Sequence, residues 1–208
     1  MEKPATATPT LDALSSMSVF KIAFWSALGV YVPFIAFCMV LILADGIASP
    51  ADDMPASWAT FLILVGNLFL GPLIWAVFMI FGRWVYEKVY VKLDPVPLVF
   101  SGGGFCFHQL GRDSLYQMLV ACGRGLMVVY GIFFGLIVLL MLLMNLLAGT
   151  LDQSAILIGF AFIAAIILLL IPYVWAFFLA LGGTLMKPLT RRLGWGQLEF
   201  VTRGVNNG

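Results

Sequence analysis

Long apolar runs separated by short polar segments make up most of the chain. Four runs extend over residues 22–44, 58–82, 126–147 and 155–185, and none of them contains Asp, Glu, Lys or Arg. About 20 apolar residues are enough for a helix to cross the hydrocarbon core of a bilayer, and each run is longer than that. The pattern therefore predicts an all-α integral membrane protein with four transmembrane helices.

The composition supports this interpretation. The chain has 208 residues, of which 62% are hydrophobic and 10% are charged, whereas soluble domains carry about 25% charged residues. A chain of this length has too little polar surface to enclose so many apolar side chains, so the bilayer is the expected solvent. The net charge of +1 gives no electrostatic reason to expect a nucleic acid. The expected partners are the lipid bilayer and other membrane proteins or further copies of the chain.

The basic residues predict the orientation of the helices. All 11 Lys and Arg residues lie before the first run, between the second and third, or after the fourth. The two other loops contain no basic residue and four acidic ones, Asp45, Asp52, Asp53 and Asp152. Because cytoplasmic loops are enriched in Lys and Arg, we expect both termini and the central loop in the cytoplasm. The expected location is the plasma membrane, and the bacterial inner membrane in particular.

These assignments divide the chain into five segments. In chain order we expect a disordered N-terminal tail, a first transmembrane hairpin, a cytoplasmic loop, a second hairpin and a cytoplasmic C-terminal tail, over residues 1–18, 19–82, 83–118, 119–186 and 187–208. The N-terminal tail is rich in Ala, Thr, Ser and Pro, a composition typical of disorder. Tryptophan favours the membrane–water interface, and three tryptophans near predicted helix ends are expected interface anchors: Trp25, Trp58 and Trp84.

One sequence pattern occurs in both predicted hairpins. Residues 72–82 and 172–182 share Pro-x-[Ile/Val]-Trp-Ala-x-Phe-x-x-x-Gly. Compositional chance is the alternative, but Pro and Trp are rare enough here to favour a duplication, because similarity at a fixed period indicates a repeat. Both hairpins would enter from the cytoplasm, so the sequence predicts a parallel repeat with a pseudo-twofold axis along the membrane normal.

Several helix positions are candidates for kinks or for helix packing. Proline removes a backbone hydrogen bond and bends a helix, and small residues four apart let helices approach closely. A hinge or cavity at the kink is the functional alternative, and shape matching between packed helices is the interpretation we favour. The candidates are Pro33, Pro72, Pro172, Asn67, Gly131 and Gly135.

The central loop and the C-terminal tail contain the non-membrane features. Residues 96–101, 105–110 and 197–203 are short runs with strand-forming residues, and a glycine cluster separates the first two. We expect them to form a small cytoplasmic β-element. The same side of the protein carries the candidate surface for a partner, which consists of His108, Arg112, Asp113, Arg191 and Arg192.

Candidate chemistry is sparse. Cys106 and His108 form a Cys-x-His pair, but a metal site needs three or four ligands, so we predict no metal, cofactor or catalytic residue. The four spans lack the intramembrane acids that proton- and ion-coupled carriers use. We therefore expect a non-catalytic multi-pass component of a larger inner-membrane complex: a scaffold, accessory, exclusion or assembly factor, of secretion or conjugation type. A small transporter or channel subunit acting as an oligomer is the alternative, and an enzyme for lipid-linked substrates is the least favoured class.

Overall fold

The fold is built from four long helices. The computed structural model describes residues 9–48, 54–90, 94–101, 104–148 and 151–201. The elements are η1 (Leu11–Ala13), α1 (Ser16–Ala48), α2 (Met54–Val89), η2 (Phe107–Gln109), α3 (Arg112–Leu147) and α4 (Leu151–Leu193). Within the described residues, four helical stretches are long and apolar enough to cross a membrane: Ser16–Ile42, Leu62–Val89, Arg112–Leu147 and Ile158–Leu193. The prediction of an all-helical chain with four candidate spans is confirmed.

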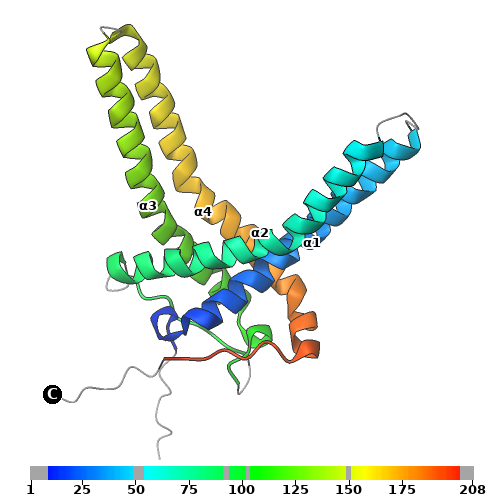
Figure 1. Cartoon of the computed structure of the whole chain (residues 1–208). Coiled ribbons are helices and arrows are strands. Elements are labelled where there is room, and N and C mark those ends of the chain that lie inside the picture. Colours follow the sequence, from blue (N-terminus) through cyan, green and yellow to red (C-terminus); the bar gives the residue numbers. More distant parts are fainter. Residues whose placement is uncertain (1–8, 49–53, 91–93, 102–103, 149–150, 202–208) are drawn as a thin grey trace, which may run out of the picture.

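The helices form two hairpins that share one base (Figure 1). Helices α1 and α2 lie side by side in one arm, and α3 and α4 in the other. The arms diverge, so their tips lie far apart, while at the base α1 contacts α4 and α2 contacts α3. The two 3₁₀ helices and the extended segments pack beneath this crossing, where most of the buried side chains gather.

Glycine allows the closest helix contacts in the base. A Cβ placed on Gly29 of α1 would overlap the backbone of Gly182 on α4, and a Cβ on Gly125 of α3 would overlap the carbonyl oxygen of Gly82 on α2. Any larger residue would push these helix pairs apart, because backbone atoms cannot rotate away as a side chain can. The crossing of the two hairpins therefore depends on glycine, as is common where membrane helices meet.

Extended segments at the base are joined by two similar sets of backbone hydrogen bonds. Leu11 donates to the carbonyl of Val96 at 3.0 Å, and Leu98 donates to Pro9 at 2.7 Å. The second set has the same form: the amide of Phe107 donates to Gly196 at 2.6 Å, and that of Leu198 donates to Phe105 at 2.9 Å. In each set an extended segment preceding a 3₁₀ helix pairs with a segment that follows a hairpin.

The expected β-element is not formed as strands. No strand occurs in the described residues; residues 96–101, 105–110 and 197–201 instead meet through isolated antiparallel bridges, which pair Phe100 with Leu110 and Cys106 with Gln197. The reason is local. The pairing segment turns into η2 directly after Cys106, so too few extended residues follow to continue a ladder. Residues 202 and 203 lie outside the described residues.

The N-terminal segment differs from the disordered tail that its composition predicts. From Pro9 onward it is packed against the base, and the side chains of Leu11 and Leu14 are buried. Helix α1 begins at Ser16, and the amide of Ser18 donates to the hydroxyl of Ser15 at 3.1 Å, which caps the first turn. Residues 1–8 lie outside the described residues.

Candidate functional site

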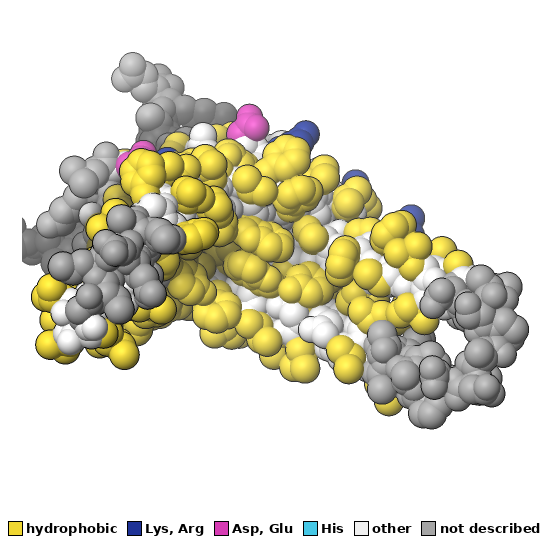
Figure 2. Space-filling model, turned by 90° about the horizontal axis from the view of Figure 1, so that it is seen from above, with side chains coloured by type: hydrophobic (Ala, Val, Ile, Leu, Met, Phe, Trp, Pro, Cys, Tyr) yellow, Lys and Arg dark blue, Asp and Glu magenta, His cyan; other side chains and the backbone are white. Residues whose placement is uncertain are grey.

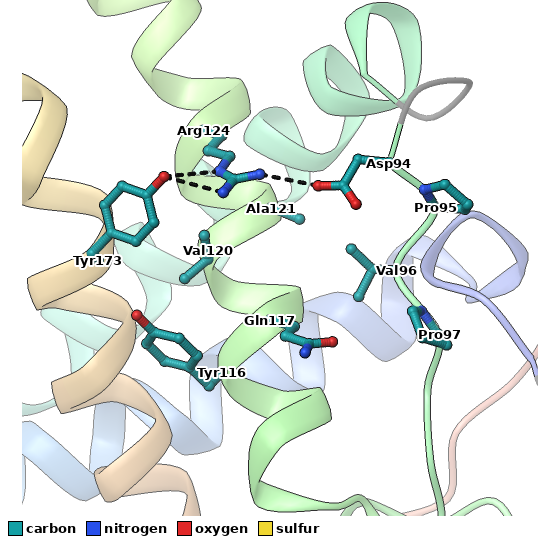
Figure 3. A pocket seen from close by; sticks show the side chains of 10 residues that line it. All are labelled: Asp94, Pro95, Val96, Pro97, Tyr116, Gln117, Val120, Ala121, Arg124 and Tyr173. Carbon is teal, nitrogen blue, oxygen red and sulfur yellow. Dashed lines mark hydrogen bonds and ion pairs between the residues drawn. The ribbon is translucent and has the colours of Figure 1, made fainter.

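A pocket of about 430 Å³ lies between α3, α4 and the segment that follows α2 (Figure 3). Its volume falls within the range of about 300–1,000 Å³ that small-molecule sites occupy. One wall is the proline-rich segment, and the other is built by one face of α3 together with a tyrosine of α4. The lining residues are Asp94, Pro95, Val96, Pro97, Tyr116, Gln117, Val120, Ala121, Arg124 and Tyr173. We call this the Arg124 pocket.

Arg124 is the charged centre of this pocket. Its Nε and Nη2 atoms donate to the hydroxyl of Tyr173 at 3.3 and 3.1 Å, and its Nη1 forms an ion pair with Asp94 Oδ2 at 3.1 Å. The guanidinium also lies over the Tyr173 ring, 5.5 Å from its centroid. Within the described residues these contacts engage three of the five N–H groups of arginine, which leaves two for a ligand.

The backbone of Asp94 is held independently of its side chain. Its amide donates to the carbonyl of Tyr90 at 3.0 Å, and its own carbonyl accepts a hydrogen bond from the hydroxyl of the buried Tyr86. The Asp94 carboxylate is therefore placed by α2, whereas Arg124 is placed by α3. Both side chains are accessible, with 63% of Asp94 and 38% of Arg124 exposed. An accessible ion pair contributes at most about 1 kcal/mol to stability, so the pair of Asp94 and Arg124 adds little to the stability of the fold.

A second pocket, of about 450 Å³, occupies the matching place on α1, and we call it the aromatic pocket. The match rests on two serines that bind the backbone in the same way. Ser114 accepts a hydrogen bond from the amide of Val99 at 2.9 Å, and Ser18 accepts one from Glu199 at 2.7 Å. The residues that follow Ser18 on α1 line the aromatic pocket, just as those that follow Ser114 on α3 line the Arg124 pocket. The described lining of the aromatic pocket is Met17, Phe20, Lys21, Phe24, Trp25, Gly194, Trp195 and Gln197.

The chemistry of the two pockets differs. Among the described residues that line the aromatic pocket, Lys21 is the charged one, and it donates to the carbonyl of Gln197 at 3.4 Å. Trp25 is buried and packs against Trp195, with ring centroids 6.4 Å apart. Of these two pockets, the Arg124 pocket combines a cation with an acid among its described lining residues, and the aromatic pocket does not.

The predicted partner surface is largely accessible. Arg112 and Asp113 at the start of α3 are exposed, as are Arg191 and Arg192 at the end of α4. His108 is half-buried in η2, and its Nδ1 atom has no hydrogen-bond partner among the described residues. The described residues contain no group of three His, Cys, Asp or Glu that would hold a metal ion.

The predicted anchors lie in different environments. Trp84 is 55% exposed and stacks on Phe81, as an interfacial side chain would. Trp25, in contrast, belongs to the packed base. The Trp58 side chain lies outside the described residues.

The candidate packing positions also differ in their burial and contacts. Pro72 and Pro172 are buried, whereas Pro33 is exposed. Asn67 is exposed and donates to the carbonyl of Ile63 in its own helix at 3.0 Å, not to another helix. A Cβ on Gly131 or Gly135 would meet no atom within 4 Å, so this Gly-x-x-x-Gly pair makes no close contact with the described part of the chain. The predicted packing residues did not include glycines that are closely packed, among them Gly29, Gly82, Gly125 and Gly182.

The Arg124 pocket was not predicted either. Arg124 and Asp94 are 30 positions apart in the chain, and Arg124 and Tyr173 are 49 apart. The available signal was an arginine next to a long apolar run, since ionisable residues at membrane depth are costly and often functional.

The chain matches no protein-family model, no curated protein and no solved structure. Its fold and surface define its class: four helices long and apolar enough to span a membrane, as in a multi-pass membrane protein. Hydrophobic side chains cover most of the surface seen in Figure 2, and the few charged ones lie near its edge.

Proposed function

We propose that this protein is a non-catalytic component of a larger complex in the bacterial inner membrane. It would act as a scaffold, accessory, exclusion or assembly factor in secretion- or conjugation-type machinery. The observation that carries the proposal is the divergence of the two arms, which leaves large apolar faces of the described helices exposed. Helices of other membrane proteins would cover those faces.

The distribution of charge supports a component over a carrier. The four apolar runs contain no charged side chain, and coupled carriers usually need such groups within the membrane. The described charged residues gather instead around the base and the helix ends, where they can meet soluble parts of a complex. With both termini and the base in the cytoplasm, this surface would comprise His108, Arg112, Asp113, Arg191 and Arg192.

We also propose that the chain is a duplicated hairpin. Trp75 and Trp175, which occupy the same place in the shared sequence pattern, pack against each other with ring centroids 5.2 Å apart. The paired glycine contacts and the two similar sets of backbone hydrogen bonds at the base support the same proposal. Two residues that a pseudo-twofold axis relates can touch only near that axis, so the axis would pass between these tryptophans.

The proposal is tested by purifying the tagged full chain in a mild detergent. We expect stable co-purification of other membrane proteins. The double variant Gly131→Leu/Gly135→Leu should reduce their recovery, because leucine would block close approach to α3 from outside. The matched control is Gly159→Leu on α4, where a Cβ also meets no atom within 4 Å. Recovery of the chain alone, or only as a homo-oligomer, would contradict the proposal.

The alternative is a small transporter or channel subunit that acts as an oligomer. The open angle between the arms favours it, since a second copy could close that space into a pathway. Solute flux into liposomes that disappears in Asn67→Ala or Pro72→Ala would support this alternative. We expect no such flux.

A further inference from the structure

We propose that the Arg124 pocket binds the headgroup of a phospholipid that carries both a phosphate and a primary ammonium, as in phosphatidylethanolamine. This inference goes beyond membership of a complex. It requires only that the base of the helices lies at a membrane surface.

The position of the pocket fits a headgroup. On α3 the residues before Arg124 are mostly buried in the base, whereas the helix beyond Tyr130 is an exposed apolar arm. Arg124 therefore lies where the packed base passes into the apolar arm. Arginine and tyrosine suit this level of a membrane, because each joins an apolar stem or ring to a polar end that stays in water. A lipid could place its headgroup in the pocket and its acyl chains along the arm.

The charges of the pocket select the type of headgroup. A headgroup with only negative charge would be attracted by Arg124 and repelled by Asp94, and a purely cationic one would meet the reverse. A zwitterion satisfies both, with its phosphate on the two remaining N–H groups of Arg124 and its ammonium beside the Asp94 carboxylate. Tyr116 and Gln117 add hydrogen-bonding groups to the same lining.

The nature of the ammonium follows from hydrogen bonding. A primary ammonium can donate a charge-assisted hydrogen bond to Asp94, which is stronger than one between neutral groups. The trimethylammonium of phosphatidylcholine has no N–H to donate. The site should therefore prefer phosphatidylethanolamine to phosphatidylcholine by about tenfold, the value of one such bond.

The test measures lipid binding to the full chain in a neutral detergent by native mass spectrometry. The probes are phosphatidylethanolamine, phosphatidylcholine and phosphatidylglycerol with identical acyl chains. Wild-type protein should bind the first about tenfold more tightly than the other two. Equal binding of all three lipids would overturn the proposal without any variant.

Two variants then assign the preference to its residues. Arg124→Gln should weaken binding of phosphatidylethanolamine about tenfold, because the phosphate loses its cation. Asp94→Asn should reverse the preference toward phosphatidylglycerol, because the acid that repels an anionic headgroup is gone. Asp94→Glu should restore the wild-type order. A preference that survives both Arg124→Gln and Asp94→Asn would place the binding elsewhere and overturn the assignment.

The aromatic pocket provides the matched control. It has a similar volume and a matching place on α1, but its lining combines no cation with an acid. Lys21→Gln should leave the order of the three lipids unchanged, and a changed order would contradict the assignment. Free O-phosphoethanolamine should fail to displace the bound lipid, because it lacks the acyl chains. Displacement at equal concentration would show a site for a soluble ligand and refute the lipid.

Discussion

The glycine contact between α2 and α3 offers a direct test of how the base is packed. A Cβ on Gly125 would overlap the carbonyl oxygen of Gly82 and lie 2.9 Å from the amide nitrogen of Tyr86. Both neighbours are backbone atoms, so neither can turn away. In Gly125→Ala the two helices must therefore separate, and the buried side chains around the crossing lose contacts.

Two contributions of opposite sign decide the size of the effect. Alanine favours a helix over glycine by about 1 kcal/mol, which would stabilise any glycine position within α3. Overpacking in a filled interior costs about 1–3 kcal/mol, and the upper end applies because the obstacle is backbone. We expect Gly125→Ala to lower the free energy of unfolding by about 2 kcal/mol.

Gly131→Ala in the same helix is the matched control. A Cβ at Gly131 meets no atom within 4 Å, so only the favourable helix propensity remains. The free energy of unfolding should stay unchanged or rise by up to about 1 kcal/mol. Both variants can be compared with the wild-type protein by titration from mild detergent into sodium dodecyl sulfate, followed by circular dichroism. Equal stability of the two variants would refute the proposed contact between α2 and α3.

Two further predictions concern polar contacts at the base, and the same titration measures both. Arg83 and Glu87 form a 2.6 Å ion pair with side chains only 8% and 23% exposed. Arg83→Met or Glu87→Gln alone should therefore lower the free energy of unfolding by about 3 kcal/mol, and the double variant should lower it by less than the sum of the two. Additive losses would contradict an interaction between the two side chains. Ser114→Ala removes the acceptor of the Val99 amide and should cost about 1 kcal/mol. Ser101→Ala removes an exposed hydrogen bond to Gln109 and should change stability by less than about 0.5 kcal/mol. Equal losses in these two serine variants would contradict the expected difference.

The four candidate spans could be predicted because the requirement behind them is local. A backbone inside a bilayer must satisfy its own hydrogen bonds, so a long apolar run without charges has little choice but to form a helix. The predicted runs accordingly lie within α1 to α4. The cytoplasmic location of both termini rests on the basic residues and stays a prediction.

The packing of the base could not be predicted in the same way. The polar composition of residues 1–18 indicated disorder, yet Leu11 and Leu14 are buried, because segments from distant parts of the chain provide the surface that covers them. The three runs with strand-forming residues do come together, but the turn into η2 limits them to single bridges. The strand propensity of a segment does not show how many of its residues stay extended when the following residues turn into a helix.

The sequence alone thus determined which segments can cross a membrane, since hydropathy and length belong to each segment separately. The tertiary structure decided which small residues make contact. Gly131 and Gly135 have the expected spacing, but a Cβ added to either would meet no atom within 4 Å, whereas Gly29 and Gly82 are closely packed. The crossing of the hairpins decides which positions make contact. The tertiary structure also decided the candidate site, since only the packing of α2, α3 and α4 brings Asp94, Arg124 and Tyr173 together.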